Sequence, residues 1–433
     1  MKRSSTTEER RHRERALLVG VVTPKTERLE IEDSLHELER LVDTFGSDTT
    51  GRVIQVLEKY SSAFLIGRGK AQEIARRVKG EGIDLVVFDD DLSPIQQRNL
   101  EQVIGRPVID RHGLILEIFG QHARTYEAKL QVDLAKNRYL LPRLTHAWTH
   151  FSRQRGGVVV RGAGETQLEV DRRMVRHRIR ALNRKLAQVS QQRDTRRKGR
   201  ESVHRVALVG YTNSGKSTLM NVLTSSNVLV YDRLFATLDS TVRSIRPPDM
   251  PRILVTDTVG FIRKLPHGLV ASFKSTLEEV SVADLLLQVV DLSDPRFEKK
   301  MEATETVLAE LSLERKPKIL VFNKADLLPV RSKLPAMVRS VFSESVVVSG
   351  VAGTGIDDLK AKIQEYFSKR WRDREMTLDY GAADLLSGIY EIGRVNSVEY
   401  QPHGIVVRFL ASDPDFARIE RQIANHRIRH RAT

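Results

Sequence analysis

The sequence predicts a multidomain α/β protein in which a small α/β domain and a long antiparallel helical hairpin precede a larger α/β domain with a mostly parallel sheet. Apolar runs of strand length alternate with helical patterns over residues 16–112 and again over residues 203–370. Over residues 113–200, apolar residues instead recur at intervals of three and four, the spacing of amphipathic helices. At 433 residues the chain has room for about three domains.

Composition narrows the class of protein. With 40% hydrophobic and 29% charged residues the chain has the balance of a globular protein, and its lack of cysteine excludes disulfide frameworks, cysteine-ligated zinc and thiol nucleophiles. No apolar stretch is long enough to span a membrane, and the polar, basic tail of residues 1–15 does not resemble a secretory signal. We therefore expect a cytoplasmic protein with no membrane span, and we expect it to be a monomer.

In the first α/β domain, Ser34 and Glu37 stand three residues apart ahead of a helical pattern, which predicts a capping box at the start of the first helix. Further helices are expected over residues 71–78 and 94–103. The predicted strands, which we expect to form a mostly parallel sheet, cover residues 16–22, 53–57, 85–88 and 108–109.

The hairpin follows from two leucine repeats, one containing Leu130 and Leu134 and the other containing Leu182 and Leu186. Between them, residues 155–165 interleave glycines with arginines, which does not suit a helix interior. In the second α/β domain, the predicted strands cover residues 206–209, 253–255, 285–290, 319–322 and 346–348. Residues 371–433 are expected to form a small C-terminal α/β unit with one helix, two strands (395–400 and 405–410) and a final basic helix.

A phosphate-binding loop is predicted at the start of the second α/β domain. Gly210 to Ser217 match the pattern G-x-x-x-x-G-K-[ST] between a predicted strand and a helix-forming run. Backbone N–H groups of such a loop form a concave cradle for phosphates. Lys216 is expected to reach the β- and γ-phosphate oxygens, and Ser217 to hold Mg²⁺. The predicted phosphate-binding residues are Gly210, Tyr211, Thr212, Asn213, Ser214, Gly215, Lys216, Ser217 and Thr218.

Two later motifs point to guanine. Asn323-Lys324-Ala325-Asp326 follows a predicted strand, and an aspartate there can accept from the N1–H and 2-amino groups of guanine, a pattern that adenine lacks. After the next strand, Ser349 and Gly350 are expected to present a backbone N–H to guanine O6. The bound nucleotide is therefore predicted to be GTP or GDP, contacted by Asn323, Lys324, Asp326, Ser349 and Gly350.

Between these motifs lie the groups expected to contact magnesium and the γ-phosphate. Asp257 supplies a carboxylate for the magnesium shell, and Gly260 a backbone N–H for the γ-phosphate. Thr237 lies 20 residues beyond Ser217, in a run that begins near Phe235, and can cap the magnesium in the triphosphate state. Thr241 is the competing candidate on spacing. The predicted metal ligands are Ser217, Thr237 and Asp257, the predicted catalytic groups are Lys216, Thr237 and Gly260, and Phe235 is predicted to contact the nucleotide.

These motifs resemble those of translation-factor-class P-loop GTPases, and specifically the HflX family of ribosome-associated GTPases in the Obg–HflX group. The resemblance lies in residues 234–239, 257–262, 156–167, 111–119 and 129–131, and it extends over residues 16–367. It implies an α/β N-terminal domain, a helical hairpin, a GTPase domain and binding to the large ribosomal subunit, with some members splitting ribosomes under stress. The chain departs from the family pattern at Ala163 and Ser240, where proline is usual, and at Gly350, where alanine is expected.

The hydrolytic mechanism has one unusual position. Many GTPases orient the attacking water with a glutamine directly after the glycine of Asp-x-x-Gly, but here that residue is Phe261. Since an aromatic ring cannot orient water, we expect slow intrinsic turnover that a partner, the ribosome, stimulates. Asn213 adds a hypothesis: in related GTPases an asparagine at this place helps to hold K⁺, so hydrolysis is expected to be faster in KCl than in NaCl. An ordinary turn residue is the alternative.

Basic charge is concentrated in one segment. The chain carries a net +15, and between Arg172 and Arg205 thirteen Lys and Arg stand against two Asp and Glu. With the arginine- and glycine-containing loop and its aromatic residues, this predicts RNA binding that weakens with salt, and a solvated helix face is the alternative. The predicted RNA contacts are Arg153, Arg155, Arg161, Arg172, Arg173 and Arg176.

The leading functional hypothesis is a GTP hydrolase whose nucleotide state controls attachment of the basic hairpin to the ribosome. A GTPase that acts on non-ribosomal RNA and a GTP-dependent regulator of protein interactions remain as alternatives. The turn at residues 67–70, Gly-Arg-Gly-Lys, is interpreted as an ordinary turn, with a second nucleotide site for ATP as the alternative that the resemblance suggests. Asp89 to Asp91 are interpreted as a strand end rather than a metal site.

Overall fold

The computed structural model describes residues 13–144, 167–198, 204–225, 234–235, 240–245, 251–264, 279–329, 332–382 and 385–424, apart from 414, 418 and 422. The described residues up to Gln188 form one compact unit, and those from Val189 onward form another. Within these ranges, none of the helices combines the length and the apolar character needed to cross a membrane.

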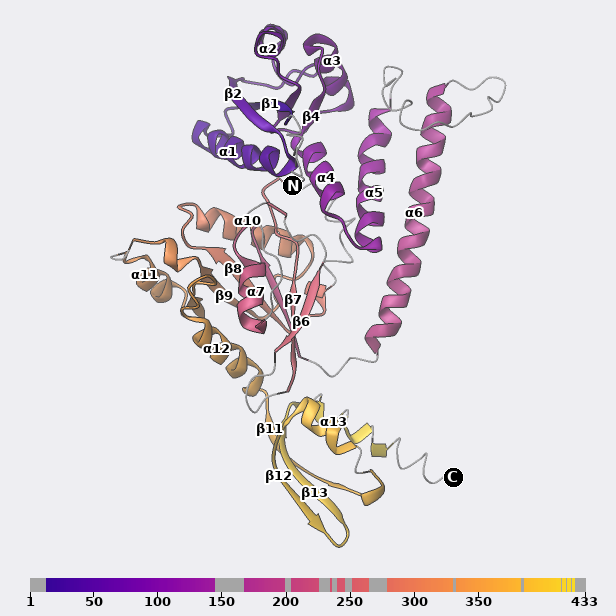
Figure 1. Cartoon of the computed structure of the whole chain (residues 1–433), viewed down its shortest axis with the longest axis vertical. Coiled ribbons are helices and arrows are strands. Elements are labelled where there is room, and N and C mark those ends of the chain that lie inside the picture. Colours follow the sequence, from indigo (N-terminus) through magenta and orange to yellow (C-terminus); the bar gives the residue numbers. More distant parts are fainter. Residues whose placement is uncertain are drawn as a thin grey trace, which may run out of the picture. The chain divides into compact units, whose positions relative to one another are not determined.

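The first unit contains β1 (Arg15–Val22), α1 (Arg28–Phe45), β2 (Asp48–Val56), α2 (Arg68–Glu81), β3 (Leu85–Phe88), α3 (Pro94–Ile104), β4 (Val108–Asp110), α4 (Arg111–His122), α5 (Tyr126–Leu140), a 3₁₀ turn η1 (Leu141–Arg143) and α6 (Gln167–Lys198), whose last residues belong to the second unit. The four described strands pair in parallel in the order β2-β1-β3-β4. Figure 1 shows this sheet with its helices in indigo and purple. The predicted parallel sheet is confirmed.

Strand β1 lies inside the sheet and is buried on both faces, which explains its nearly continuous apolar sequence. On one face, Leu17 and Val19 pack in a core with Ile74 of α2 and Leu100 of α3. On the other face α1 approaches so closely at Gly20 that an added Cβ would lie 2.8 Å from a methyl carbon of Ile31. The small residue therefore sets the distance between α1 and the sheet.

The predicted capping box at Ser34 and Glu37 is wrong. Helix α1 begins earlier, at Arg28, and Ser34 lies inside it with 4% of its surface exposed. Its hydroxyl donates to the carboxylate of Asp89 at 2.8 Å, so this serine connects α1 to the end of β3 rather than capping a helix. A complete capping box does occur at α3, where the Ser93 and Gln96 side chains each accept from the other's backbone N–H.

A buried arginine lies where strands β3 and β4 end. Arg111 is 1% exposed, and its guanidinium pairs with Asp89 at 3.1 Å and with Glu37 at 2.8 Å. It also donates to the backbone carbonyl of Ser34 at 3.0 Å. Because Arg111 opens α4, these bonds fix that helix against α1. Helix α4 thus packs on the α/β domain. The boundary predicted at residue 113 falls inside this helix. The hairpin itself consists of α5 and α6.

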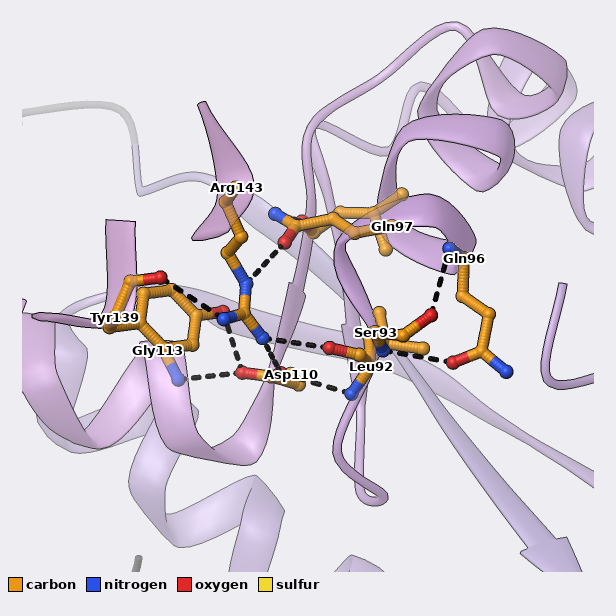
Figure 2. A network of polar contacts seen from close by, with 9 residues as sticks. Leu92, Ser93, Gln96, Gln97, Asp110, Gly113, Tyr139 and Arg143 are labelled. Carbon is orange, nitrogen blue, oxygen red and sulfur yellow. Dashed lines mark hydrogen bonds and ion pairs between the residues drawn. The ribbon is translucent and has the colours of Figure 1, made fainter. Parts of the chain in front are cut away.

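A second polar network, shown in Figure 2, joins the end of α5 to the sheet. Asp110, fully buried at the end of β4, accepts from the Tyr139 hydroxyl at 2.8 Å and from the guanidinium of Arg143 at 3.1 Å. Arg143 also donates to the Gln97 side chain at 3.0 Å and to the Leu92 carbonyl at 2.7 Å. Its guanidinium lies 3.6 Å from the centre of the Tyr139 ring. The turn that ends α5 is therefore fixed to the α/β domain.

Individual polar contacts join α6 to α5 and to the residue after η1. Next to η1, the Leu144 carbonyl accepts from Arg172 of α6 at 3.1 Å, and farther along, Asp133 of α5 pairs with Arg178 at 2.9 Å. Together with the Asp110–Arg143 network, these contacts fix the end of α5 and the first turns of α6 to the α/β domain.

The second unit contains β5 (His204–Gly210), α7 (Lys216–Thr224), β6 (Thr241–Ile245), β7 (Ile253–Asp257), β8 (Leu285–Asp291), α10 (Phe297–Glu310), β9 (Lys318–Asn323), η3 (Ala325–Leu327), α11 (Leu334–Val341), β10 (Ser345–Val347), α12 (Ile356–Ser368), β11 (Arg372–Leu378), η4 (Tyr380–Ala382), α13 (Leu385–Ile392), β12 (Arg394–Gln401) and β13 (Gly404–Ala411). Its described strands form a six-stranded sheet, β10-β9-β8-β5-β7-β6, parallel except for β6. The second mostly parallel sheet is thereby confirmed. Sequence analysis missed β6, an edge strand with few buried residues.

The C-terminal residues form a separate antiparallel sheet among the described strands, in the order β11-β13-β12. Sequence analysis missed β11 because Arg-Asp-Arg-Glu-Met-Thr-Leu has few apolar residues. In the structure, Arg374, Met376 and Leu378 are nevertheless less exposed than the residues between them, the alternation of a half-buried strand.

Replacing Arg143 with alanine tests whether the Asp110 network stabilises the first unit. The variant leaves the fully buried Asp110 carboxylate without its guanidinium, which is expected to cost about 3–5 kcal/mol. Arg28→Ala is the matched control, because its ion pair with Glu32 is exposed and is worth at most about 0.5 kcal/mol. Urea denaturation of the whole chain measures both; equal losses for the two variants would contradict the assignment.

Candidate functional site

The loop from Gly210 to Ser217 connects β5 to α7, and its backbone requires its glycines. Gly210 has φ +146° and Gly215 has φ +88°, conformations that disfavour other residues. A Cβ on Gly210 would lie 2.2 Å from the Val289 carbonyl oxygen, and one on Gly215 would lie 2.3 Å from the side-chain nitrogen of Asn323. The loop is therefore packed directly against β8 and the end of β9.

Lys216 is the charged centre of the loop. Its side chain curls back so that Nζ donates to the carbonyls of Gly210 at 3.2 Å and Tyr211 at 2.9 Å, and 6% of the residue is exposed. Burial lowers its pKa to about 8, although the nearby Asp257 carboxylate acts in the opposite direction. An anion in the loop would stabilise the charged form, so the arrangement suits a phosphate.

Ser217 and Asp257 provide oxygen atoms beside this lysine. The Ser217 hydroxyl donates to Asp257 Oδ2 at 2.5 Å, and Asp257, at the end of β7, is 1% exposed. A hydroxyl and a carboxylate in contact fit Mg²⁺, which prefers oxygen ligands. Of the two threonine candidates, Thr237 lies outside the described residues, whereas Thr241 lies in β6, where it pairs with Asp257 across the sheet.

The segment after Asp257 lies against the loop. A Cβ on Gly260 would come within 2.5 Å of the Thr212 Cα and 3.0 Å of Lys216 Nζ, so only glycine fits there. Phe261 follows with 2% of its surface exposed. From a third segment, the backbone N–H of Phe235 donates to the Thr212 hydroxyl at 3.1 Å. The structure thus brings three of the predicted motifs together around Lys216.

The predicted guanine motifs meet beside Ser214 and Gly215 of the loop. Asn323 donates to the Ser214 carbonyl at 2.9 Å and accepts from the Gly350 N–H at 3.0 Å, so it joins the loop to the turn after β10. The Ser349 hydroxyl donates to Asp326 Oδ1 at 2.5 Å, which fixes the orientation of that carboxylate. The bond to Asn323 uses the backbone of Gly350, so it does not depend on the side chain at this position.

Sequence reasoning missed two groups that support this site. Asp291, at the end of β8, pairs with Lys324 at 2.8 Å and so holds the motif's lysine. Thr258 is 1% exposed, and its hydroxyl donates to the Leu208 carbonyl at 2.6 Å, which ties the end of β7 to β5. Asp291 could have been found from the sequence, because it is an acidic residue at the end of β8, the strand that pairs with β5. The sequence contains no comparable signal for Thr258.

Three of the predicted RNA contacts line a cleft in the first unit. Its volume is about 800 Å³, and it is lined by Leu141, Glu169, Arg172, Arg173, Arg176, Ile179 and Arg180. Four arginines from three turns of α6 thus line the cleft together with a single glutamate of the same helix. The other predicted contacts, Arg153, Arg155 and Arg161, lie outside the described residues.

The alternative second nucleotide site at residues 67–70 corresponds to the N-terminus of α2. Gly67 has extended backbone with φ −67°, and nothing lies within 4 Å of where a Cβ of Gly69 would be. Lys70 pairs with Glu73 at 2.7 Å. These contacts are those of an ordinary turn. The alternative of an ATP site at this turn gains no support from the geometry.

Asp326→Asn tests the role of the carboxylate in base selection. The asparagine Oδ1 can still accept from Ser349, so its amide NH₂ would replace the second carboxylate oxygen, the one expected to accept from guanine. That group clashes with the guanine donors but suits the carbonyl at C2 of xanthine, so GDP affinity is expected to fall at least about 100-fold while xanthosine diphosphate becomes the better ligand. The control Asp357→Asn changes a fully exposed carboxylate on α12. Calorimetry in which Asp326→Asn still prefers GDP would refute the assignment.

Family models match successive parts of the chain. Three family models match the chain: GTP-binding GTPase N-terminal at residues 32–120, GTP-binding GTPase Middle Region at residues 122–200, and 50S ribosome-binding GTPase at residues 205–324. A GTP-binding protein of Sulfolobus solfataricus, solved in complex with GDP, aligns over 81% of this chain and 98% of its own, at 24% identity and a TM-score of 0.43.

Close relatives share most of the chain. GTPase HflX of Magnetococcus marinus is 46% identical over 81% of this chain and 82% of its own length. GTPase HflX of Gluconacetobacter diazotrophicus is 40% identical over 94% of this chain and 98% of its own. GTPase HflX of Escherichia coli is 42% identical over 91% and 92%. With the P-loop fold and the convergence of the guanine and phosphate motifs, this similarity shows that the chain is a GTP-binding GTP hydrolase and belongs to the HflX family.

Proposed function

We propose that this GTPase attaches to the large ribosomal subunit through RNA, and that its nucleotide state controls the attachment. The observation that carries the proposal is the row of arginines 172, 173, 176 and 180 along one cleft of α6. Guanidinium groups on successive helical turns match the repeated phosphates of an RNA backbone better than they match a single small anion. The description of the matching family model, 50S ribosome-binding GTPase, favours ribosomal RNA as the partner.

The position of the cleft supports this assignment. Leu141 lines it, and Arg172 donates to the Leu144 carbonyl, so the cleft lies beside the turn η1 that ends α5. The Asp110–Arg143 network fixes η1 to the α/β domain. In the proposed function, the cleft therefore presents its arginines from a rigid base, which lowers the entropic cost of binding.

At the nucleotide site, the roles follow the geometry. Mg²⁺ would be held by Ser217 and Asp257, with Thr237 as the proposed third protein ligand, and it would neutralise phosphate charge. Lys216 binds the β- and γ-phosphate oxygens and stabilises the charge that develops on them, while the N–H of Gly260 donates to the γ-phosphate. Asp326, oriented by Ser349, selects guanine.

The same geometry explains an expected low intrinsic rate. Phe261 occupies the place next to Gly260, and its buried phenyl ring has no polar group that could orient the attacking water. In our proposal the ribosome supplies or orders the missing group. Splitting of ribosomes under stress is an extension of this proposal and depends on the nucleotide-controlled attachment.

Co-sedimentation with ribosomal particles tests the proposed function. The whole chain is expected to migrate with large subunits in the presence of a non-hydrolysable GTP analogue and less so with GDP. Binding without nucleotide dependence would favour a GTPase that acts on RNA more generally, and no particle binding would favour a regulator of protein interactions. Either result would contradict the proposal.

Charge variants test the cleft. Changing Arg172, Arg173 and Arg176 together to glutamine is expected to reduce the slope of log affinity against log salt by about 2–3, because up to three phosphate contacts are lost. The matched control changes three exposed basic residues of the same unit, Lys59, Arg76 and Lys79, to glutamine. An equal effect of both triple variants would show that overall charge, and not the cleft, determines binding.

A monovalent-ion comparison tests the K⁺ hypothesis. Asn213 has φ +59°, so Asn213→Gly removes the side-chain oxygen while keeping a backbone that glycine adopts readily. We expect the natural chain to hydrolyse GTP faster in KCl than in NaCl, and Asn213→Gly to abolish that difference. The measurement is phosphate release at equal ionic strength. Equal rates of the natural chain in both salts would eliminate a role for K⁺.

A further inference from the structure

The backbone of the phosphate loop pairs with the segment that follows Asp257. Tyr211 and Phe261 form a parallel bridge, in which the Phe261 N–H donates to the Gly210 carbonyl at 3.0 Å and the Thr212 N–H donates to the Phe261 carbonyl at 2.7 Å. This bridge places Gly260 beside Lys216. These two backbone bonds help to hold the turn whose Gly260 N–H is the proposed γ-phosphate contact.

The side chain of Tyr211 extends this connection. Its hydroxyl accepts from the backbone N–H of Arg263 at 2.8 Å, two residues beyond Phe261. The ring is only 4% exposed, and the ammonium of Lys300 on α10 lies 5.0 Å from its centre. Lys300 is itself held by an ion pair with Asp294. The hydroxyl therefore reaches Arg263 from a ring whose position is fixed by a neighbouring helix.

Because Gly260 packs tightly against Thr212, a small movement of residues 260–263 would change the distance from Gly260 to the phosphate site. A Cβ at Gly260 would lie 2.5 Å from Thr212 Cα, so the two backbones are already as close as glycine permits. A shift of the segment away from the loop would move the Gly260 N–H away from Lys216. Because a hydrogen bond depends steeply on distance and angle, such a shift would weaken a contact to the γ-phosphate more than any contact to the α- and β-phosphates.

We propose that the Tyr211 hydroxyl is a positioning group for the GTPase reaction, which holds residues 260–263 against the phosphate loop so that the enzyme distinguishes GTP from GDP. The backbone of Tyr211 is part of the phosphate-binding loop. Its side chain bonds to residues 260–263, the segment proposed to contact the γ-phosphate. Lys216 connects the two functions, since its ammonium donates to the Tyr211 carbonyl and has to leave it for a phosphate. This role concerns nucleotide discrimination and is independent of any ribosomal partner.

A purely structural role for Tyr211 makes a different prediction. If the ring only fills space, removing the hydroxyl leaves binding unchanged. If the hydroxyl only stabilises the fold, its loss weakens both nucleotides equally. Preferential loss of triphosphate binding is specific to a positioning role.

The test uses Tyr211→Phe in the whole chain, which keeps the ring and removes the hydroxyl. Titration calorimetry with Mg²⁺ present compares GDP with the non-hydrolysable analogue GMPPNP. We expect GMPPNP to bind about three- to tenfold more weakly, the loss expected for one hydrogen bond, while GDP affinity stays within about twofold. Tyr366→Phe is the matched control, because its hydroxyl donates to the Asp284 carbonyl at 2.9 Å elsewhere in the same unit. It should change neither affinity.

Hydrogen exchange gives a second readout that does not require nucleotide. In Tyr211→Phe, the peptide containing Arg263 should exchange its amide hydrogens faster than in the natural chain, and Tyr366→Phe should leave that peptide unchanged. Unchanged exchange at Arg263, an equal loss of affinity for both nucleotides, or no loss for GMPPNP would each overturn the proposal.

Discussion

The site depends on one constraint: an ammonium group is held in a buried loop whose backbone has no room to move. The side chain of Lys216 is almost completely enclosed, and it is satisfied by two carbonyls of its own loop. Desolvation disfavours its charge and lowers its pKa to about 8. Phosphate oxygens would replace the neutral carbonyl acceptors of the Lys216 ammonium with charged ones. The loop is therefore arranged to favour an anionic ligand.

The surrounding elements keep that loop in place from several sides. Val289 of β8 and Asn323 at the end of β9 leave no room for side chains at Gly210 and Gly215, and the segment at Gly260 closes against Thr212. Asn323 has a double role, because it connects the loop to the turn that orients Asp326 through Ser349. Phosphate binding and base selection therefore share one hydrogen-bonded framework, and a change in either is expected to reach the other.

The sequence predicted the two parallel sheets and the grouping of the nucleotide motifs, because strand–helix alternation and glycine-rich loops are local patterns. It did not predict contacts between distant residues. Ser34 looks like a helix cap, yet it bonds to Asp89, which lies 55 residues away. Asp110, Tyr139 and Arg143 carry no recognisable motif, and their network becomes visible only when β4 and α5 come together. Edge strand β6 and the charged strand β11 bury too little apolar surface to show a clear pattern.

Equilibrium titration of the whole chain with non-hydrolysable GTP and ATP analogues, in the presence of Mg²⁺, tests the central claim most directly. If Lys216 and the Asn323–Asp326 motif form one guanine nucleotide site, the GTP analogue binds at least about 100-fold more tightly, because adenine cannot satisfy the oriented carboxylate of Asp326. Equal affinities for the two analogues, or tighter binding of the ATP analogue, would contradict this account.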